Sequence, residues 1–218
     1  MVLKVSGKIK LISQQKLPLI LLMIGGTLLI SGVYLRTETN NSRPQGLPQQ
    51  DAAPKTSRPS NNDIDNYKVA ADLPRIITVS KLNIKARILG VGVDKQNRIA
   101  SPTNVYDVGW FNQSSKPGRP GVMVMDGHVS SESTPGVFYN LKDLSSGDKI
   151  SVEQGNGNLL NFLVKESVTY DHDKVDMLKV LRPITPNKHG LNLITCSGKV
   201  IKGTNEFDKR VVVYAVQQ

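Results

Sequence analysis

Residues 82–88, Leu-Asn-Ile-Lys-Ala-Arg-Ile, decide the fold class. Apolar and polar side chains alternate along the whole stretch, which is the period of a β-strand that buries one of its two faces. A helix of the same length would need its apolar residues three and four positions apart. The stretch therefore predicts a strand that lies on a hydrophobic core.

Outward from this stretch, the chain continues as short strands separated by turns. Clusters of Gly, Pro, Asn or Asp divide most of them. Residues 138–144 and 175–181 differ, because their apolar side chains recur at every third position and predict two short helices. Seven or eight strands with two helical insertions indicate an all-β fold, a closed antiparallel barrel over residues 71–218. The other strand candidates are Arg75–Val79, Gly121–Met125, Lys149–Glu153, Leu159–Thr169, Leu191–Cys196 and Arg210–Val216.

The N-terminal part contains a stretch long enough to cross a membrane. Residues 17–35 carry no charge, and at about 1.5 Å per residue they span about 28 Å, close to a hydrocarbon core of about 30 Å. Four lysines precede them, so the positive-inside rule predicts residues 1–16 in the cytoplasm and everything from residue 36 outside. We expect a single-pass anchor in the cell membrane. A cleaved signal peptide is the alternative, although no A-x-A-like site follows the apolar run.

Residues 36–70 differ in composition from both of their neighbours. They are rich in Asn, Gln, Pro and Ser and poor in large apolar side chains. Such a segment does not bury enough apolar surface to fold, which predicts a flexible extracytoplasmic linker. The linker would hold the domain at 71–218 some distance from the bilayer.

Charge and cysteine content narrow the function classes. The formal net charge is +10, but residues 1–70 hold nine Lys/Arg against four Asp/Glu, so half of the excess lies outside the predicted domain. No dense basic run interleaved with aromatic residues occurs, and we expect no nucleic-acid partner. The chain has one cysteine, Cys196, which excludes an intramolecular disulfide. A lone thiol in an exported domain is either a small buried apolar residue or a reactive group.

Cys196 ends the predicted strand LNLITC, and Arg210 begins the strand RVVVYAV. If these two strands pair as antiparallel neighbours, the end of one lies beside the start of the other, and thiol and guanidinium share one rim of the barrel. A register slip by one residue would separate the two side chains.

The chain offers three histidines as a base for this thiol. His128 follows the predicted strand GVMVM and emerges at a strand end. His189 lies seven residues before Cys196 along mostly extended chain, which places it about 20 Å away at about 3.3 Å per residue. His172 sits in a polar stretch and is expected at the surface. By elimination, His128 is the best partner.

Three short motifs now resemble the signature of one family. DGH at 126–128, LITC at 193–196 and the Arg that opens RVVVYA at 210–215 resemble the sortase motifs, in sortase order. The runs IITVSKLNIKARILGVGV at 76–93 and VGWFNQSSKPGRPGVMVMDGHVS at 108–130 are also similar to the start of a sortase domain. The resemblance covers roughly residues 72–216. Ser-Gly directly after the cysteine is more similar to the smaller, non-housekeeping sortase classes.

The resemblance implies a fold and an activity. It implies an eight-stranded sortase-type barrel and a cysteine transpeptidase that cleaves an LPXTG-like sorting signal between Thr and Gly. Partners would be proteins with a C-terminal sorting signal and an amine acceptor, either a cell-wall precursor or a pilin lysine. In this sequence Cys196 would be the nucleophile, His128 the acid and base, and Arg210 the oxyanion or substrate clamp. No acidic cluster matches the calcium site of some members, and we expect no metal and no cofactor.

The chemistry suits these residue types. A thioester survives long enough for an amine to react before water, and a histidine protonates the leaving amine. At pH 7 an unperturbed Cys is about 3% thiolate, and nearby positive charge would raise that fraction. Thr195 packs beside the nucleophile and is a candidate substrate contact. Two alternatives stay open: an L,D-transpeptidase-like thiol enzyme, whose His closely precedes the Cys, and an inactive membrane-tethered binding domain.

Overall fold

The computed structural model describes residues 55–218. The predicted anchor at 17–35 lies outside the described residues. Within residues 55–218, every helix is too short or too polar to cross a bilayer.

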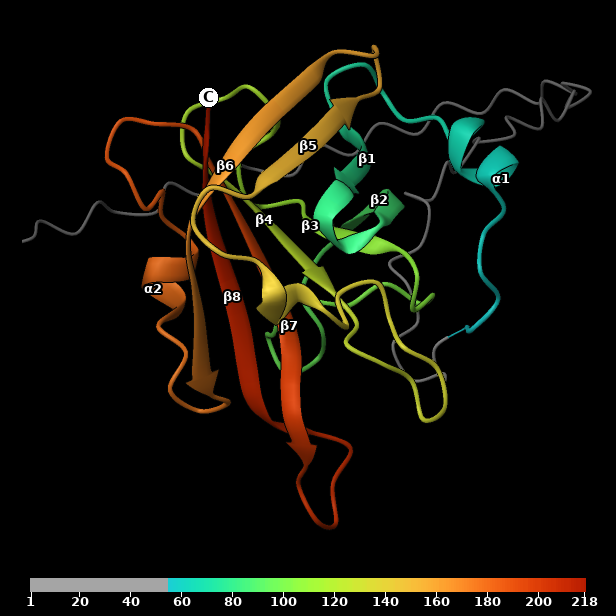
Figure 1. Ribbon diagram of the computed structural model, residues 1–218, viewed down its shortest axis with the longest axis vertical. Coiled ribbons are helices and arrows are strands. Elements are labelled where there is room, and N and C mark those ends of the chain that lie inside the picture. The colour runs from blue at the N-terminus through green and yellow to red at the C-terminus, as the bar shows by residue number, and fades with distance from the viewer. Residues whose placement is uncertain (1–54) are drawn as a thin grey trace, which may run out of the picture. The chain divides into compact units, whose positions relative to one another are not determined.

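Eight strands close into one barrel in the order β1-β2-β3-β4-β7-β8-β6-β5 (Figure 1). The predicted all-β barrel is thereby confirmed. The strands are β1 (Pro74–Val79), β2 (Ile84–Val91), β3 (Val108–Phe111), β4 (Val122–Gly127), β5 (Lys149–Gln154), β6 (Leu159–Asp171), β7 (Gly190–Val200) and β8 (Phe207–Gln217). The helices are short: α1 (Asn61–Asp65) and α2 (Met177–Val180), with 3₁₀ turns η1 (Ser80–Leu82) and η2 (Leu141–Asp143).

The prediction that all strands are antiparallel is wrong for two pairs. β2 and β3 run parallel, and so do β4 and β7. A parallel pair needs a long crossover connection. The chain supplies one between β2 and β3 through residues 92–107, and another between β4 and β7 that contains β5 and β6. The second crossover places the end of β4 beside Ile194 of β7.

One strand escaped the sequence analysis because it shows no alternation. All four residues of β3 are buried, with Trp110 4% and Phe111 8% exposed. A strand that is buried on both faces loses the period of two. Trp110 and Phe111 both belong to the core.

The barrel strands bury two apolar clusters. The larger fills the barrel and includes Val211 and Val213, whereas the smaller includes Val212 and Tyr214 together with Val180 of α2. β8 is therefore buried on both faces, which explains its continuous apolar sequence. The predicted helices at 138–144 and 175–181 exist only as the single turns η2 and α2.

The folded part begins before residue 71, which corrects the predicted extent of the flexible linker. Residues 61–65 form α1, whose Ser60 and Asp63 make a capping box and whose Ile64 is 7% exposed. The Tyr67 hydroxyl donates to the Ile88 carbonyl at 3.1 Å. A polar segment therefore folds by local capping and a single buried side chain, which composition alone did not reveal.

Candidate active site

Cys196 and Arg210 are direct partners across the antiparallel pair β7 and β8. The predicted pairing is thus confirmed, with one correction. Neither residue is at a strand end, because β7 continues to Val200 and β8 begins at Phe207. The two strands continue as a hairpin beyond the end of β4 (Figure 1). Directly opposed residues place their side chains on the same face of the sheet, so thiol and guanidinium share one surface.

His128 directly follows β4, the other neighbour of β7. The parallel register of these strands ends with Asp126 opposite Ile194. The Thr195 hydroxyl then donates to the Gly127 carbonyl at 2.7 Å, which carries the alignment one residue further. Continuing this register sets His128 beside Cys196. Three adjacent strands therefore bring the three predicted residues to one end of the barrel.

The His128 imidazole has a defined tautomer. Its Nε2 lies 2.7 Å from the Pro102 carbonyl oxygen. A carbonyl oxygen only accepts, so Nε2 carries the hydrogen, and Nδ1 is the nitrogen that exchanges a proton. The backbone is held as well, because Phe138 N–H donates to the His128 carbonyl at 3.0 Å. A Cβ at Gly136 would lie 2.3 Å from that carbonyl oxygen, so this close approach requires glycine.

Arg210 belongs to a network that includes a second arginine. Its Nη1 donates to the Phe207 and Lys209 carbonyls at 2.8 and 2.9 Å, and its Nη2 lies 3.5 Å from Glu206. The other Glu206 oxygen accepts from Arg98 at 2.5 Å. Sequence analysis missed Arg98 and Glu206, because both lie in loops without a periodic pattern.

Asp126 adds a carboxyl group that the sequence analysis quoted within DGH but left without a role. Its Oδ2 accepts a hydrogen bond from the Ser101 hydroxyl at 2.5 Å. Burial raises the pKa of Asp126 to about 6, against the opposing effects of the Ser101 hydrogen bond and the charges of His128 and Arg210. The site therefore contains a carboxyl group that titrates near pH 6.

Burial raises the pKa of the Cys196 thiol. Arg210 opposes this effect, whereas Asp126 and Glu206 raise the pKa of the thiol further. The expectation that positive charge promotes the thiolate is met by Arg210 in direction, but desolvation outweighs it. At neutral pH the thiol form dominates.

The remaining sequence candidates lie elsewhere. Thr195 is 2% exposed, and its hydroxyl is used between β7 and β4, so its observed contact is structural. His189 precedes β7 and lies with its Nδ1 3.2 Å from Gln217, at the opposite end of the strand from Cys196. His172 is a surface residue, with its Nδ1 3.9 Å from Asp173. Residues 55–218 contain no cluster of three or more His, Cys, Asp or Glu placed to hold a metal ion.

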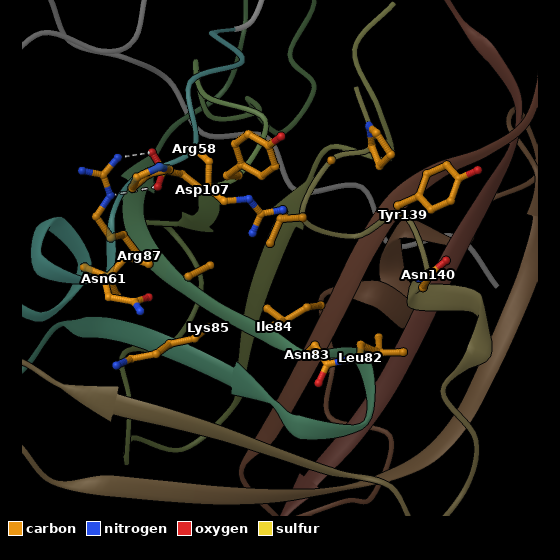
Figure 2. A pocket seen from close by; sticks show the side chains of 17 residues that line it. Arg58, Asn61, Leu82, Asn83, Ile84, Lys85, Arg87, Asp107, Tyr139 and Asn140 are labelled. Carbon is orange, nitrogen blue, oxygen red and sulfur yellow. Dashed lines mark hydrogen bonds and ion pairs between the residues drawn. The ribbon is translucent and has the colours of Figure 1, made fainter. Parts of the chain in front are cut away.

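A cavity of about 310 Å³ lies between α1, β2 and the segment 135–140 (Figure 2). The dashed lines in Figure 2 join Arg87 to Asp107, which lies across from it. Cys196, His128 and Arg210 do not line this cavity. It is a separate feature of the barrel surface.

Comparisons with known proteins agree with this fold. The model of the Sortase domain matches residues 77–218. Sortase A from Corynebacterium diphtheriae, as a lid mutant, has a similar fold, with 21% identity, a TM-score of 0.51, and coverage of 76% of this chain and 84% of that one. The pilus-related sortase C of Group B Streptococcus is 19% identical, with a TM-score of 0.51 and coverage of 78% and 77%. No curated protein sequence matches.

The domain match spans well over half of the chain and includes the strands β4, β7 and β8 on or beside which His128, Cys196 and Arg210 lie. The chain therefore belongs to the sortase family, and it is a cysteine transpeptidase that acts on sorting signals.

Proposed function

We propose that Cys196 is the nucleophile, His128 the general acid and base, and Arg210 the oxyanion clamp of a sortase that cleaves an LPXTG-like signal between Thr and Gly. The observation that carries this proposal is the adjacency of β4, β7 and β8, with Cys196 directly opposite Arg210. The residue types match the needs of an acyl transfer: a nucleophile, a group that titrates near neutral pH, and a permanent cation.

Acylation begins with attack of the Cys196 thiolate on the carbonyl carbon of the signal threonine. Negative charge develops on the carbonyl oxygen, and the Arg210 guanidinium stabilises it. Collapse of the tetrahedral intermediate breaks the Thr–Gly bond, and protonated His128 supplies the proton that the leaving glycine amine needs. The product is a thioester between Cys196 and the threonine carbonyl.

Deacylation reverses the roles. A primary amine attacks the thioester carbonyl, and the neutral Nδ1 of His128 accepts the proton that the amine loses. The acceptor is a cell-wall precursor or a pilin lysine, both of which present such an amine. The thiolate leaves and the enzyme returns to its starting state.

We infer that only a small fraction of the molecules is competent at one time. Burial raises the pKa of Cys196, so the reaction needs a thiolate that forms rarely while His128 must also be protonated. A reaction that needs both a thiolate and a protonated imidazole has a bell-shaped pH dependence, and the raised pKa of Cys196 makes the enzyme slow.

We propose further that residues 17–35 anchor the chain in the cell membrane, with 1–16 in the cytoplasm and the barrel outside. The uncharged run of residues and the preceding lysines support this orientation. Protease added to intact cells would then degrade the barrel and spare a tag at residue 1. Protection of the barrel would overturn the orientation.

We also propose that the chain belongs to one of the non-housekeeping sortase classes, which the Ser-Gly that follows Cys196 supports.

The catalytic assignment is tested with the full chain, a fluorogenic LPXTG peptide and hydroxylamine as the amine. Wild-type protein is expected to release a threonine hydroxamate, and Cys196→Ala to release none. His128→Ala is compared with His189→Ala, which changes the same residue type at the other end of β7. Loss of product in the first variant alone supports the assignment. Equal loss in both, or product with Cys196→Ala, contradicts it.

A further inference from the structure

Two consecutive residues of the loop before β3 contact both side chains that flank Gly127. The Ser101 hydroxyl donates to Asp126 at 2.5 Å, and the Pro102 carbonyl accepts from His128 at 2.7 Å. Asp126 and His128 are two residues apart along one extended segment, so they face the same way. One loop therefore holds a carboxylate and an imidazole next to each other.

The loop itself is fixed by neighbouring backbone. Lys55 N–H donates to the Thr103 carbonyl at 2.7 Å, and Val105 N–H donates to the Lys55 carbonyl at 3.0 Å. On the other side of the loop, Ala100 N–H donates to the Gly92 carbonyl at 3.0 Å. With its ends held in this way, the loop keeps Ser101 and Pro102 in place.

Charged and titratable groups face Asp126 from its own strand and from the barrel strands beyond it. His128 extends β4 itself, Cys196 comes from β7 and Arg210 from β8. On the opposite side, β3 places Gly109 beside Asp126 and contributes no charge. The carboxylate attracts His128 and Arg210 and repels a Cys196 thiolate.

We propose that Asp126 is a positioning residue of the sortase reaction. Together with Ser101 and Pro102, it holds His128 and Arg210 in place. Its negative charge at the same time opposes formation of the thiolate at Cys196. This inference rests on the proposed function. It also explains why a carboxyl group persists in a site where desolvation opposes its charge. An apolar residue here would favour the thiolate but would remove the negative charge that attracts both His128 and Arg210.

The proposal predicts opposite effects on two rates in Asp126→Asn. The thiolate is the species that reacts with iodoacetamide, so alkylation of Cys196 at pH 7.5 is expected to rise about 3- to 10-fold, as for a drop of up to one pKa unit. Cleavage of the LPXTG peptide, measured as kcat/KM, is expected to fall about 10-fold, because the imidazole loses its electrostatic partner. Unfolding would also expose the buried thiol and abolish cleavage, so the Asp126→Asn variant must first show the cooperative urea transition of a folded protein.

Ser101→Ala provides a second, independent test. The Ser101 hydrogen bond lowers the pKa of Asp126, so its loss leaves more neutral carboxyl groups near pH 6.5. Alkylation of Cys196 in this variant is expected to exceed the wild-type rate at pH 6.5 and to equal it at pH 8.5. Asp143→Asn, which removes an exposed carboxylate on η2, serves as the matched control and is expected to leave both rates unchanged.

The outcomes separate this inference from the proposed function. Unchanged alkylation in Asp126→Asn, or alkylation and cleavage that fall together, would overturn the positioning role. A wild-type chain that alkylates at Cys196 but fails to cleave the peptide would overturn the proposed function, and the reaction role of Asp126 with it. The alkylation profiles would still decide whether Asp126 opposes the thiolate.

Discussion

Two arginine–carboxylate pairs on this barrel are built differently. On β2, Arg87 donates two hydrogen bonds to Asp107 at 2.8 and 2.9 Å, and the Asp107 side chain is only 3% exposed (Figure 2). On β8, Arg210 reaches Glu206 through one contact of 3.5 Å, and Glu206 is 41% exposed. The Arg87 guanidinium is held by its carboxylate through two hydrogen bonds. The second guanidinium is held at Nη1 by two backbone carbonyls, but its carboxylate holds Nη2 only loosely, so this nitrogen remains available to a developing oxyanion.

The β2 pair is expected to matter for stability. Asp107→Ala would leave the part-buried Arg87 without its partner, and loss of one member of a buried pair costs about 3–5 kcal/mol of the free energy of unfolding. Urea denaturation followed by fluorescence of Trp110 would measure this loss. Asp143→Ala, at an exposed carboxylate, is the matched control. A loss below about 1 kcal/mol would show that the paired geometry contributes little.

The β8 pair is expected to matter for the reaction instead. Arg210→Ala removes the oxyanion clamp, and loss of one such group lowers the rate about 100- to 1000-fold. Arg210→Lys keeps the charge without the planar fork and is expected to recover part of kcat. The free energy of unfolding should change by less than about 1 kcal/mol, because the Glu206 contact is exposed. A large loss of stability with little loss of kcat would reverse the comparison.

Asp126 is intermediate between Asp107 and Glu206, because burial raises its pKa but no arginine or lysine forms an ion pair with it among the described residues. Its folded pKa of about 6 exceeds the ordinary aspartate value of 3.8, so the folded state binds more protons and stability falls as pH rises from about 4 to 6. Asp126→Asn removes this penalty. It is expected to raise the free energy of unfolding by about 1–3 kcal/mol at pH 7.5 and to leave it unchanged near pH 3.5. Destabilisation at pH 7.5 would contradict the assigned burial cost.

Sequence patterns predicted the parts of this molecule that carry a period. The alternation around residues 82–88 located β2, although the strand begins at Ile84 because Ser80–Leu82 form a 3₁₀ turn. The thiol and guanidinium were paired correctly because two neighbouring strands of similar length have few possible registers. The parallel pairing of β4 and β7 was not predictable, since it depends on where a long crossover returns.

Sequence analysis predicted less about the contacts and pKa values of individual charged side chains. Asp126 stood in a quoted motif, but its importance depends on Ser101, which is 25 residues away in the chain. Arg98 and Glu206 are 108 residues apart and meet only in the folded barrel. Burial of Cys196 also reversed the expected net effect on its pKa. Such effects depend on desolvation and distance, which local patterns do not encode.

The smallest expected effect concerns Glu206, the carboxylate that Arg98 and Arg210 share. Its negative charge raises the pKa of Cys196, and the charge of Arg210 lowers it. Glu206→Gln keeps the shape of the side chain and removes the opposing charge, so iodoacetamide alkylation at pH 7.5 is expected to rise about 2- to 3-fold. The free energy of unfolding should change by less than about 0.5 kcal/mol, since exposed ion pairs contribute little. Slower alkylation would mean that Glu206 positions Arg210 for the thiolate, and the loose pair on β8 would then resemble the doubly hydrogen-bonded pair on β2.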